Sequence, residues 1–142
     1  MPLVQIHLVE GRDTTAIRAL ADTVHEVVVE TFAAPERDRY QIIHQHPRAC
    51  MILMDTGLGI ERSDGVMLVE ITHQGRDEAQ KQALYRRLAE LLSDRGQAMP
   101  EDLIVAVSEN RPADWSFGFG RAQFLTGELY VGPARLEPDR RA

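Results

Sequence analysis

The chain has 142 residues, 44% of them hydrophobic and 27% charged, which is typical of one globular domain and excludes disordered and fibrous classes. Its formal net charge is −6 with scattered positive residues, which argues against nucleic-acid and membrane-surface binding. We expect a cytoplasmic protein. The chain has a single cysteine, Cys50, no signal-peptide pattern, and no apolar run near the ~18 residues of a membrane span.

The first 50 residues predict a strand, a helix and a second strand. Residues 3–8 alternate apolar and polar side chains, as a half-buried strand does. A Gly-Arg-Asp triplet follows at 11–13, and apolar residues then recur every three or four positions up to residue 32. That spacing is the stripe of an amphipathic helix, with a cap at Asp13 or Thr14. Residues 40–46 predict the second strand.

The same pattern repeats after a connection at 51–65. Residues 66–72 predict a strand, a leucine stripe predicts a helix that ends at Gly96, and residues 103–107 predict a further strand. A second Gly-Arg-Asp triplet stands between strand and helix, 64 residues after the first. The sequence therefore predicts tandem β-α-β units at 2–50 and 66–110.

Each unit has the length that a parallel crossover needs. We predict a single α+β domain, 1–142, with a four-stranded mixed sheet and both helices on one face. The uncovered sheet face favours an oligomer. Residues 111–130, rich in glycine and aromatic residues, predict an ordered excursion or a short hairpin. The charged, proline-rich tail at 131–142 is expected to fray or to pack on a neighbour.

Pro2 is the first candidate for chemistry. Met1 is usually removed before a small residue, and its loss would leave Pro2 with a free secondary amine. An α-amino group titrates near 7.7–8.0, so its surroundings decide whether it acts as a base or as an acid at neutral pH. The alternative is that Pro2 only begins an edge strand, where a missing N–H does no harm.

Three further features suit a small polar site. Asp38 precedes the second strand and could approach Pro2, or it lies in a solvated turn with weak ion pairs. Arg76, beside the start of the second helix, could bind a carboxylate, although Arg12 holds the equivalent place in the first unit and favours a turn. The third feature is an aromatic run that forms either core or an apolar wall: Trp115, Phe117, Phe119 and Phe124.

No metal site is predicted. His44 and His46 lie on one face of a predicted strand, where two imidazoles could bind a metal ion, but no third ligand accompanies them.

Three stretches together resemble the tautomerase superfamily, and most closely its malonate semialdehyde decarboxylase group. They are RDRYQI at 37–42, DTGLGI at 55–60 and DWSFGFGRAQFLTGEL at 114–129. The similarity runs from Pro2 to about Leu129.

The resemblance implies a homotrimer that needs no metal or organic cofactor. Pro2 would be the catalytic amine, Asp38 its acidic partner and Arg76 the group that binds the substrate carboxylate. Gln74 replaces a second arginine of the decarboxylase pattern at a substrate-binding position. The remaining substrate-binding positions are Tyr40 and the apolar wall of Trp115, Phe117, Phe119, Phe124 and Leu129.

The expected reaction is decarboxylation of malonate semialdehyde or a similar small 3-oxo acid. The same groups would also support a tautomerase, a hydratase or a 3-haloacrylate dehalogenase, depending on the charge of Pro2. A third reading is a non-catalytic trimer that binds a small acid or a partner protein. The expected partners are a small carboxylic acid and further copies of the chain.

Overall fold

The structure is a computed structural model that describes residues 2–129. It divides into two compact units, with the boundary between residues 109 and 110. The tail predicted at 131–142 lies outside the described residues. The elements are β1 (Leu3–Val9), α1 (Thr14–Phe32), β2 (Tyr40–His46), β3 (Met67–His73), α2 (Glu78–Asp94), β4 (Leu103–Glu109) and α3 (Gln123–Thr126).

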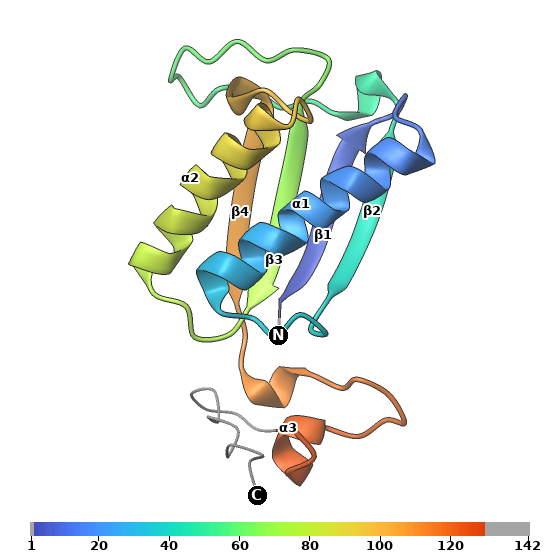
Figure 1. Cartoon of the computed structure of the whole chain (residues 1–142), viewed down its shortest axis with the longest axis vertical. Helices are drawn as coiled ribbons and strands as arrows, with labels where there is room; N and C mark the ends of the chain where they lie inside the picture. Colours follow the sequence, from blue (N-terminus) through green and yellow to red (C-terminus); the bar gives the residue numbers. More distant parts are fainter. Residues whose placement is uncertain (1, 130–142) are drawn as a thin grey trace, which may run out of the picture. The chain divides into compact units, whose positions relative to one another are not determined.

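The first unit is a four-stranded mixed sheet in the order β2-β1-β3-β4. β1 pairs in parallel with β2 and β3 pairs in parallel with β4, as two β-α-β crossovers require. The central pair, β1 and β3, is antiparallel. Both helices lie on the same face of the sheet (Figure 1), which confirms the predicted architecture.

The two repeats correspond closely in three dimensions. β1 and β3 begin and end 64 residues apart, and so do the starts of α1 and α2. Both helices are capped by the aspartate of their Gly-Arg-Asp triplet: Asp13 accepts from Ala16 N and Asp77 from Gln80 N, each at 2.8 Å. A side-chain oxygen at this position satisfies one of the unpaired N–H groups of the first turn. The triplet is therefore the signal that ends each strand and begins each helix.

The core lies between the sheet and the two helices. Alternate residues of β1 and β3 are buried, in agreement with the period-2 pattern predicted from the sequence. The buried residues of α1 and α2 cover them, spaced three or four apart. The largest fully buried apolar side chains are Ile6, Leu8, Leu20, Phe32, Met67, Ile71, Leu84, Leu88 and Leu92.

Replacing the fully buried Leu88 by alanine is expected to lower the free energy of unfolding by about 2–5 kcal/mol, because it removes packed atoms and leaves a cavity. Leu58, which is 74% exposed, provides the control, and Leu58→Ala should change the same quantity by less than about 0.5 kcal/mol. Denaturant unfolding at one protein concentration measures both. Equal losses in the two variants would contradict this description of the core.

The opposite face of the sheet carries polar side chains, with histidines at its centre. The His7 ring stacks on His44 with centroids 4.6 Å apart, and its Nδ1 lies 3.0 Å from Nε2 of His46. Its Nε2 lies 3.0 Å from a carboxylate oxygen of Glu70. Within residues 2–129, no group of three or more His, Cys, Asp or Glu is arranged to hold a metal ion. The two histidines considered as ligands are thus part of a stacked, hydrogen-bonded cluster.

None of the helices in residues 2–129 is both long and apolar enough to cross a membrane.

Candidate active site

Pro2 lies at one end of the sheet, directly before β1, and is buried. The first residue of β1, Leu3, pairs with Tyr40 of the parallel strand β2 and with Thr72 of the antiparallel strand β3. The start of β2 and the end of β3 therefore lie beside Pro2. Parallel pairing of the first two strands brings the segment that contains Asp38 to this end, as the sequence suggested.

Asp38 is half-buried in the turn before β2, where its backbone N–H donates to the Pro35 carbonyl at 2.9 Å. Burial raises the pKa of its carboxyl group, and the positive charges of the amino terminus and of Arg76 partly offset that rise. A partly desolvated carboxylate near two cationic groups is suited to stabilise a protonated amine.

Replacing Asp38 by asparagine is expected to increase stability at pH 7. The folded-state pKa lies above the unfolded value, so the ionised carboxylate costs stability at neutral pH. Below the unfolded value, near pH 3, both states are protonated and the gain should disappear. Thermal unfolding of both proteins at pH 7 and pH 3 measures this difference. An equal gain at both pH values would contradict it.

Arg76 is fixed in place by backbone carbonyl groups. Its Nε donates to the Phe32 carbonyl at 2.8 Å, its Nη1 donates to the Gln74 carbonyl, and its guanidinium lies 5.4 Å from the centroid of the Phe32 ring. Burial lowers the pKa of Arg76 and the nearby Asp38 raises it. Because a guanidinium has five N–H donors, this arrangement orients the group and leaves donors for a ligand carboxylate.

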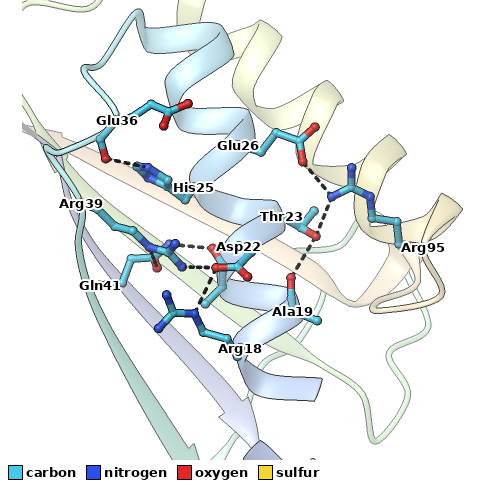
Figure 2. A network of polar contacts seen from close by, with 11 residues as sticks. Arg18, Ala19, Asp22, Thr23, His25, Glu26, Glu36, Arg39, Gln41 and Arg95 are labelled. Carbon is cyan, nitrogen blue, oxygen red and sulfur yellow. Dashed lines mark hydrogen bonds and ion pairs between the residues drawn. The ribbon is translucent and has the colours of Figure 1, made fainter. Parts of the chain in front are cut away.

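Side chains of α1 hold the segment that contains Asp38 (Figure 2). His25 Nε2 contacts the Glu36 carbonyl at 3.0 Å, before Asp38, and Arg39 donates to Asp22 at 2.7 Å, after it. The amide of Gln41, which accepts from Arg39 Nε, donates to the Ala21 carbonyl at 2.9 Å. The RDRYQI motif therefore fixes the start of β2 against the first helix, with Arg39 paired to Asp22.

The far end of the sheet repeats the Asp38 arrangement with the same 64-residue offset. Asp102 is 2% exposed, and its carboxylate accepts from the backbone N–H and the hydroxyl of Ser63, at 2.7 and 2.6 Å. Val66 occupies the place that Pro2 occupies at the first end. This aspartate thus binds the chain just before it enters the central strand. Asp38 stands at this same 64-residue offset, before β2, and its contact with the amine of Pro2 stays a prediction.

The arginines of the two ends also correspond. Arg12 Nη2 donates to the carbonyl of Gln97, shortly after α2, at 3.0 Å, as Arg76 Nε does to Phe32 at the end of α1. Each arginine therefore hydrogen-bonds the backbone at the end of the other repeat's helix. The Pro2 end would differ from the far end by its free amine, because Val66, which corresponds to Pro2, has an ordinary amide nitrogen.

Gln74 and Tyr40 also lie at the Pro2 end. The Gln74 side-chain nitrogen is buried without a hydrogen-bond partner among the described residues. Tyr40 is 40% exposed, and its pairing with Leu3 places it on the sheet face away from the helices. Pro2, one residue earlier, belongs to the helix-covered face. Their predicted substrate contacts stay predictions.

Sequence reasoning missed His73, the last residue of β3. It is fully buried, and its ring packs edge-on against Phe32 with centroids 5.4 Å apart. The signal was present, because Met67, Val69 and Ile71 mark the inward face of the strand and a two-residue period continues to position 73.

The second unit contains the aromatic run and is described by itself. Trp115 stacks on Phe117, which meets Phe124 edge to face, with centroids 5.4 and 5.5 Å apart. Gln123 supports the turn by accepting from the Phe117 N–H and donating to the Gly118 carbonyl, both at 2.9 Å.

Residues 110–129 contain a 3-10 turn and the short helix α3 but no strand, so the predicted excursion is correct and the hairpin alternative is wrong. Phe119 is 94% exposed and Leu129 is 38% exposed, whereas the stacked aromatic rings pack on one another. The apolar wall beside Pro2 stays a prediction.

Comparisons with known proteins agree with the resemblance seen in the sequence. Two family models, each described as tautomerase enzyme, match residues 2–60 and 38–118. A curated relative, the probable tautomerase YrdN of Bacillus subtilis (strain 168), is 50% identical over 129 residues, which span 91% of this chain and all of the relative.

Two solved structures are also similar over nearly their whole length. A malonate semialdehyde decarboxylase, whose structures were related to decarboxylase and hydratase activities, is 44% identical with a TM-score of 0.86, covering 90% of this chain and 99% of its own. A second such decarboxylase, inhibited by 3-bromopropiolate, is 41% identical with a TM-score of 0.86, covering 92% and 99%. A third solved structure of the same fold, a fused 4-OT that is 22% identical with a TM-score of 0.71, is a symmetric trimer.

Proposed function

Because the chain belongs to the tautomerase superfamily, we propose that it is a cofactor-independent decarboxylase of malonate semialdehyde or a similar small 3-oxo acid. The observation that carries the proposal is the convergence of Pro2, Asp38 and Arg76 at one end of the sheet. The 44% identity to a malonate semialdehyde decarboxylase supports the choice of substrate.

In the proposed reaction, the bond between the carboxylate carbon and the neighbouring methylene carbon breaks and carbon dioxide leaves. The bonding electrons move into the aldehyde carbonyl to form an enolate, which takes a proton at carbon to give acetaldehyde. A protonated Pro2 held by Asp38 would stabilise the enolate oxygen by a hydrogen bond. Alternatively, Pro2 would condense with the aldehyde and lose water, and the resulting iminium ion would accept the electrons.

The remaining groups have supporting roles in this proposal. Arg76 would hold the carboxylate, and exclusion of water from it would favour departure of neutral carbon dioxide. Further copies of the chain would cover the polar face of the sheet in a homotrimer and complete the walls of the site. The carbonyl group itself accepts the electrons, so the chemistry needs no metal or organic cofactor.

A second candidate is a promiscuous tautomerase, hydratase or 3-haloacrylate dehalogenase. The name of the curated relative, a probable tautomerase, and the hydratase activity of the solved decarboxylase favour it. A neutral Pro2 would act as a base in tautomerisation, whereas a cationic Pro2 with a water held by Asp38 would support hydration. A non-catalytic trimer that binds a small acid is the third reading.

The deciding experiment assays the purified protein with malonate semialdehyde, phenylenolpyruvate and 3-haloacrylates separately. Mass spectrometry first establishes whether Met1 has been removed. The proposal expects acetaldehyde and carbon dioxide in equal amounts from malonate semialdehyde, at the highest kcat/KM of the set. A higher value for phenylenolpyruvate would favour the tautomerase, and no turnover of any acid would favour the binding protein.

A further inference from the structure

His73 is a buried polar group that the proposed mechanism does not use. It has no exposed surface, and among residues 2–129 neither ring nitrogen has a hydrogen-bond partner at normal geometry apart from a contact with the Gln74 backbone. Buried polar groups are nearly always paired, because leaving one unpaired costs free energy. An imidazole of this kind at the end of a core strand therefore points to a partner that forms only in the functional state.

The strand register places His73 beside Pro2. β1 and β3 pair Val4 with Ile71 and Leu3 with Thr72, and continuing this register by one residue sets Pro2 opposite His73. Residues opposite one another in an antiparallel pair point to the same face. Val4 and Ile71 both lie on the buried face, so Pro2 and His73 share that face.

Two charged groups near His73, Glu109 and Arg76, are hydrogen-bonded to other groups. Glu109 of β4 pairs with it in register but accepts from the Gly75 N–H at 3.1 Å, and Arg76 donates to two carbonyls. Burial lowers the pKa of His73, the charges of Lys81 and Arg76 lower it further, and Glu109 and a contact with the Gln74 backbone raise it. At neutral pH the imidazole is therefore uncharged, with one nitrogen that can accept a hydrogen bond.

We propose that His73 is a positioning residue for the catalytic amine, accepting a hydrogen bond from the amino group of Pro2 once Met1 is removed. This inference rests on the proposed function. A protonated secondary amine has two N–H donors, so one would meet His73 and the other would stay available for the enolate oxygen, while the charge of Asp38 stabilises the cation. Both groups favour the cation, and the hydrogen bond to His73 would fix the direction of the ring nitrogen.

The test is a titration of the Pro2 amine by nitrogen-15 NMR in protein labelled at proline. Of the seven prolines, only a free amino-terminal one has an amine nitrogen rather than an amide. His73→Phe keeps the shape of a buried ring and removes the acceptor, and it is expected to lower the pKa of the amine by about one unit. His73→Gln, which restores an oxygen acceptor, should recover most of the shift. Glu109→Gln, the control for a neighbouring charge, should change it little.

Several outcomes would overturn the inference. They are an unchanged titration in the folded His73→Phe protein, equal shifts in the Phe and Gln variants, or no amine signal at all. The proposed function is tested separately. If the titration of the Pro2 amine depends on His73 but the protein does not decarboxylate malonate semialdehyde, only the proposed function is wrong. Conversely, if the protein decarboxylates malonate semialdehyde but its Pro2 amine titrates independently of His73, only this inference is wrong. The pH profile of kcat should move with the NMR titration.

Discussion

Replacing Pro2 by alanine is expected to lower kcat for malonate semialdehyde by about 10²- to 10⁴-fold, the range that a positioned acid or base contributes. Pro2 lies before the first hydrogen-bonded residue of β1, so the variant should fold with unchanged sheet pairing. Alanine is also small enough to permit removal of Met1, and it leaves a primary amine without the rigid ring. Steady-state kinetics and a circular dichroism spectrum measure the two expectations.

Reduction with borohydride separates the two proposed roles of the amine. If Pro2 forms an iminium ion, borohydride in the presence of substrate should fix a covalent adduct that mass spectrometry locates at residue 2. If Pro2 acts only as a cationic hydrogen-bond donor, no adduct forms while activity is lost in Pro2→Ala all the same. Full activity in the variant, with Met1 confirmed absent, would remove the amine from the mechanism.

The fold was predictable because its main signals are local and occur twice. The Gly-Arg-Asp triplets mark where a strand ends and a helix begins, and the observed caps at Asp13 and Asp77 explain why. The spacing of apolar residues then specifies which face of each strand and helix is buried. The mixed sheet with both helices on one side could therefore be predicted from the sequence. The aromatic segment has neither period, and its 3-10 turn and short α3 could not be distinguished from a hairpin.

The contacts of the candidate site were less predictable, because their partners are distant in sequence. Arg39 was seen beside Asp38, yet it pairs with Asp22 seventeen residues earlier, since α1 passes over the start of β2. The neighbours of His73 depend on the register of β1 and β3, which no local pattern specifies. Polar contacts of this kind can be identified only once the three-dimensional arrangement of the strands is known.

The internal repeat also supports placing the proposed chemistry at one end of the sheet. Both ends have an aspartate before an outer strand and an arginine after a central one. At the far end the chain continues through Val66, and Asp102 accepts two hydrogen bonds from Ser63. At the near end, removal of Met1 would replace the amide of Pro2, which has no N–H donor, by an amine that can be protonated near Asp38. One fold therefore provides both a structural clamp and a candidate catalytic pair.

Replacing Arg76 by glutamine is expected to lower kcat/KM by about 10²- to 10³-fold. Loss of the guanidinium removes one or two hydrogen bonds to the substrate carboxylate, and hydrogen bonds to charged groups contribute about 1.5–3 kcal/mol each. Arg76→Lys should recover only part of the loss, because an ammonium cannot match a carboxylate with two parallel donors. Steady-state kinetics with malonate semialdehyde measure these differences.

Arg12→Gln is the matched control, since Arg12 makes the same kind of bond to a backbone carbonyl after the other helix. If Arg76 acts on the substrate, both variants should lose similar stability in thermal unfolding while only Arg76→Gln loses activity. Equal losses of activity would mean that the arginine serves the fold alone. Gln74→Arg completes the series, because a second guanidinium beside the first should lower KM if the substrate carboxylate binds between positions 74 and 76.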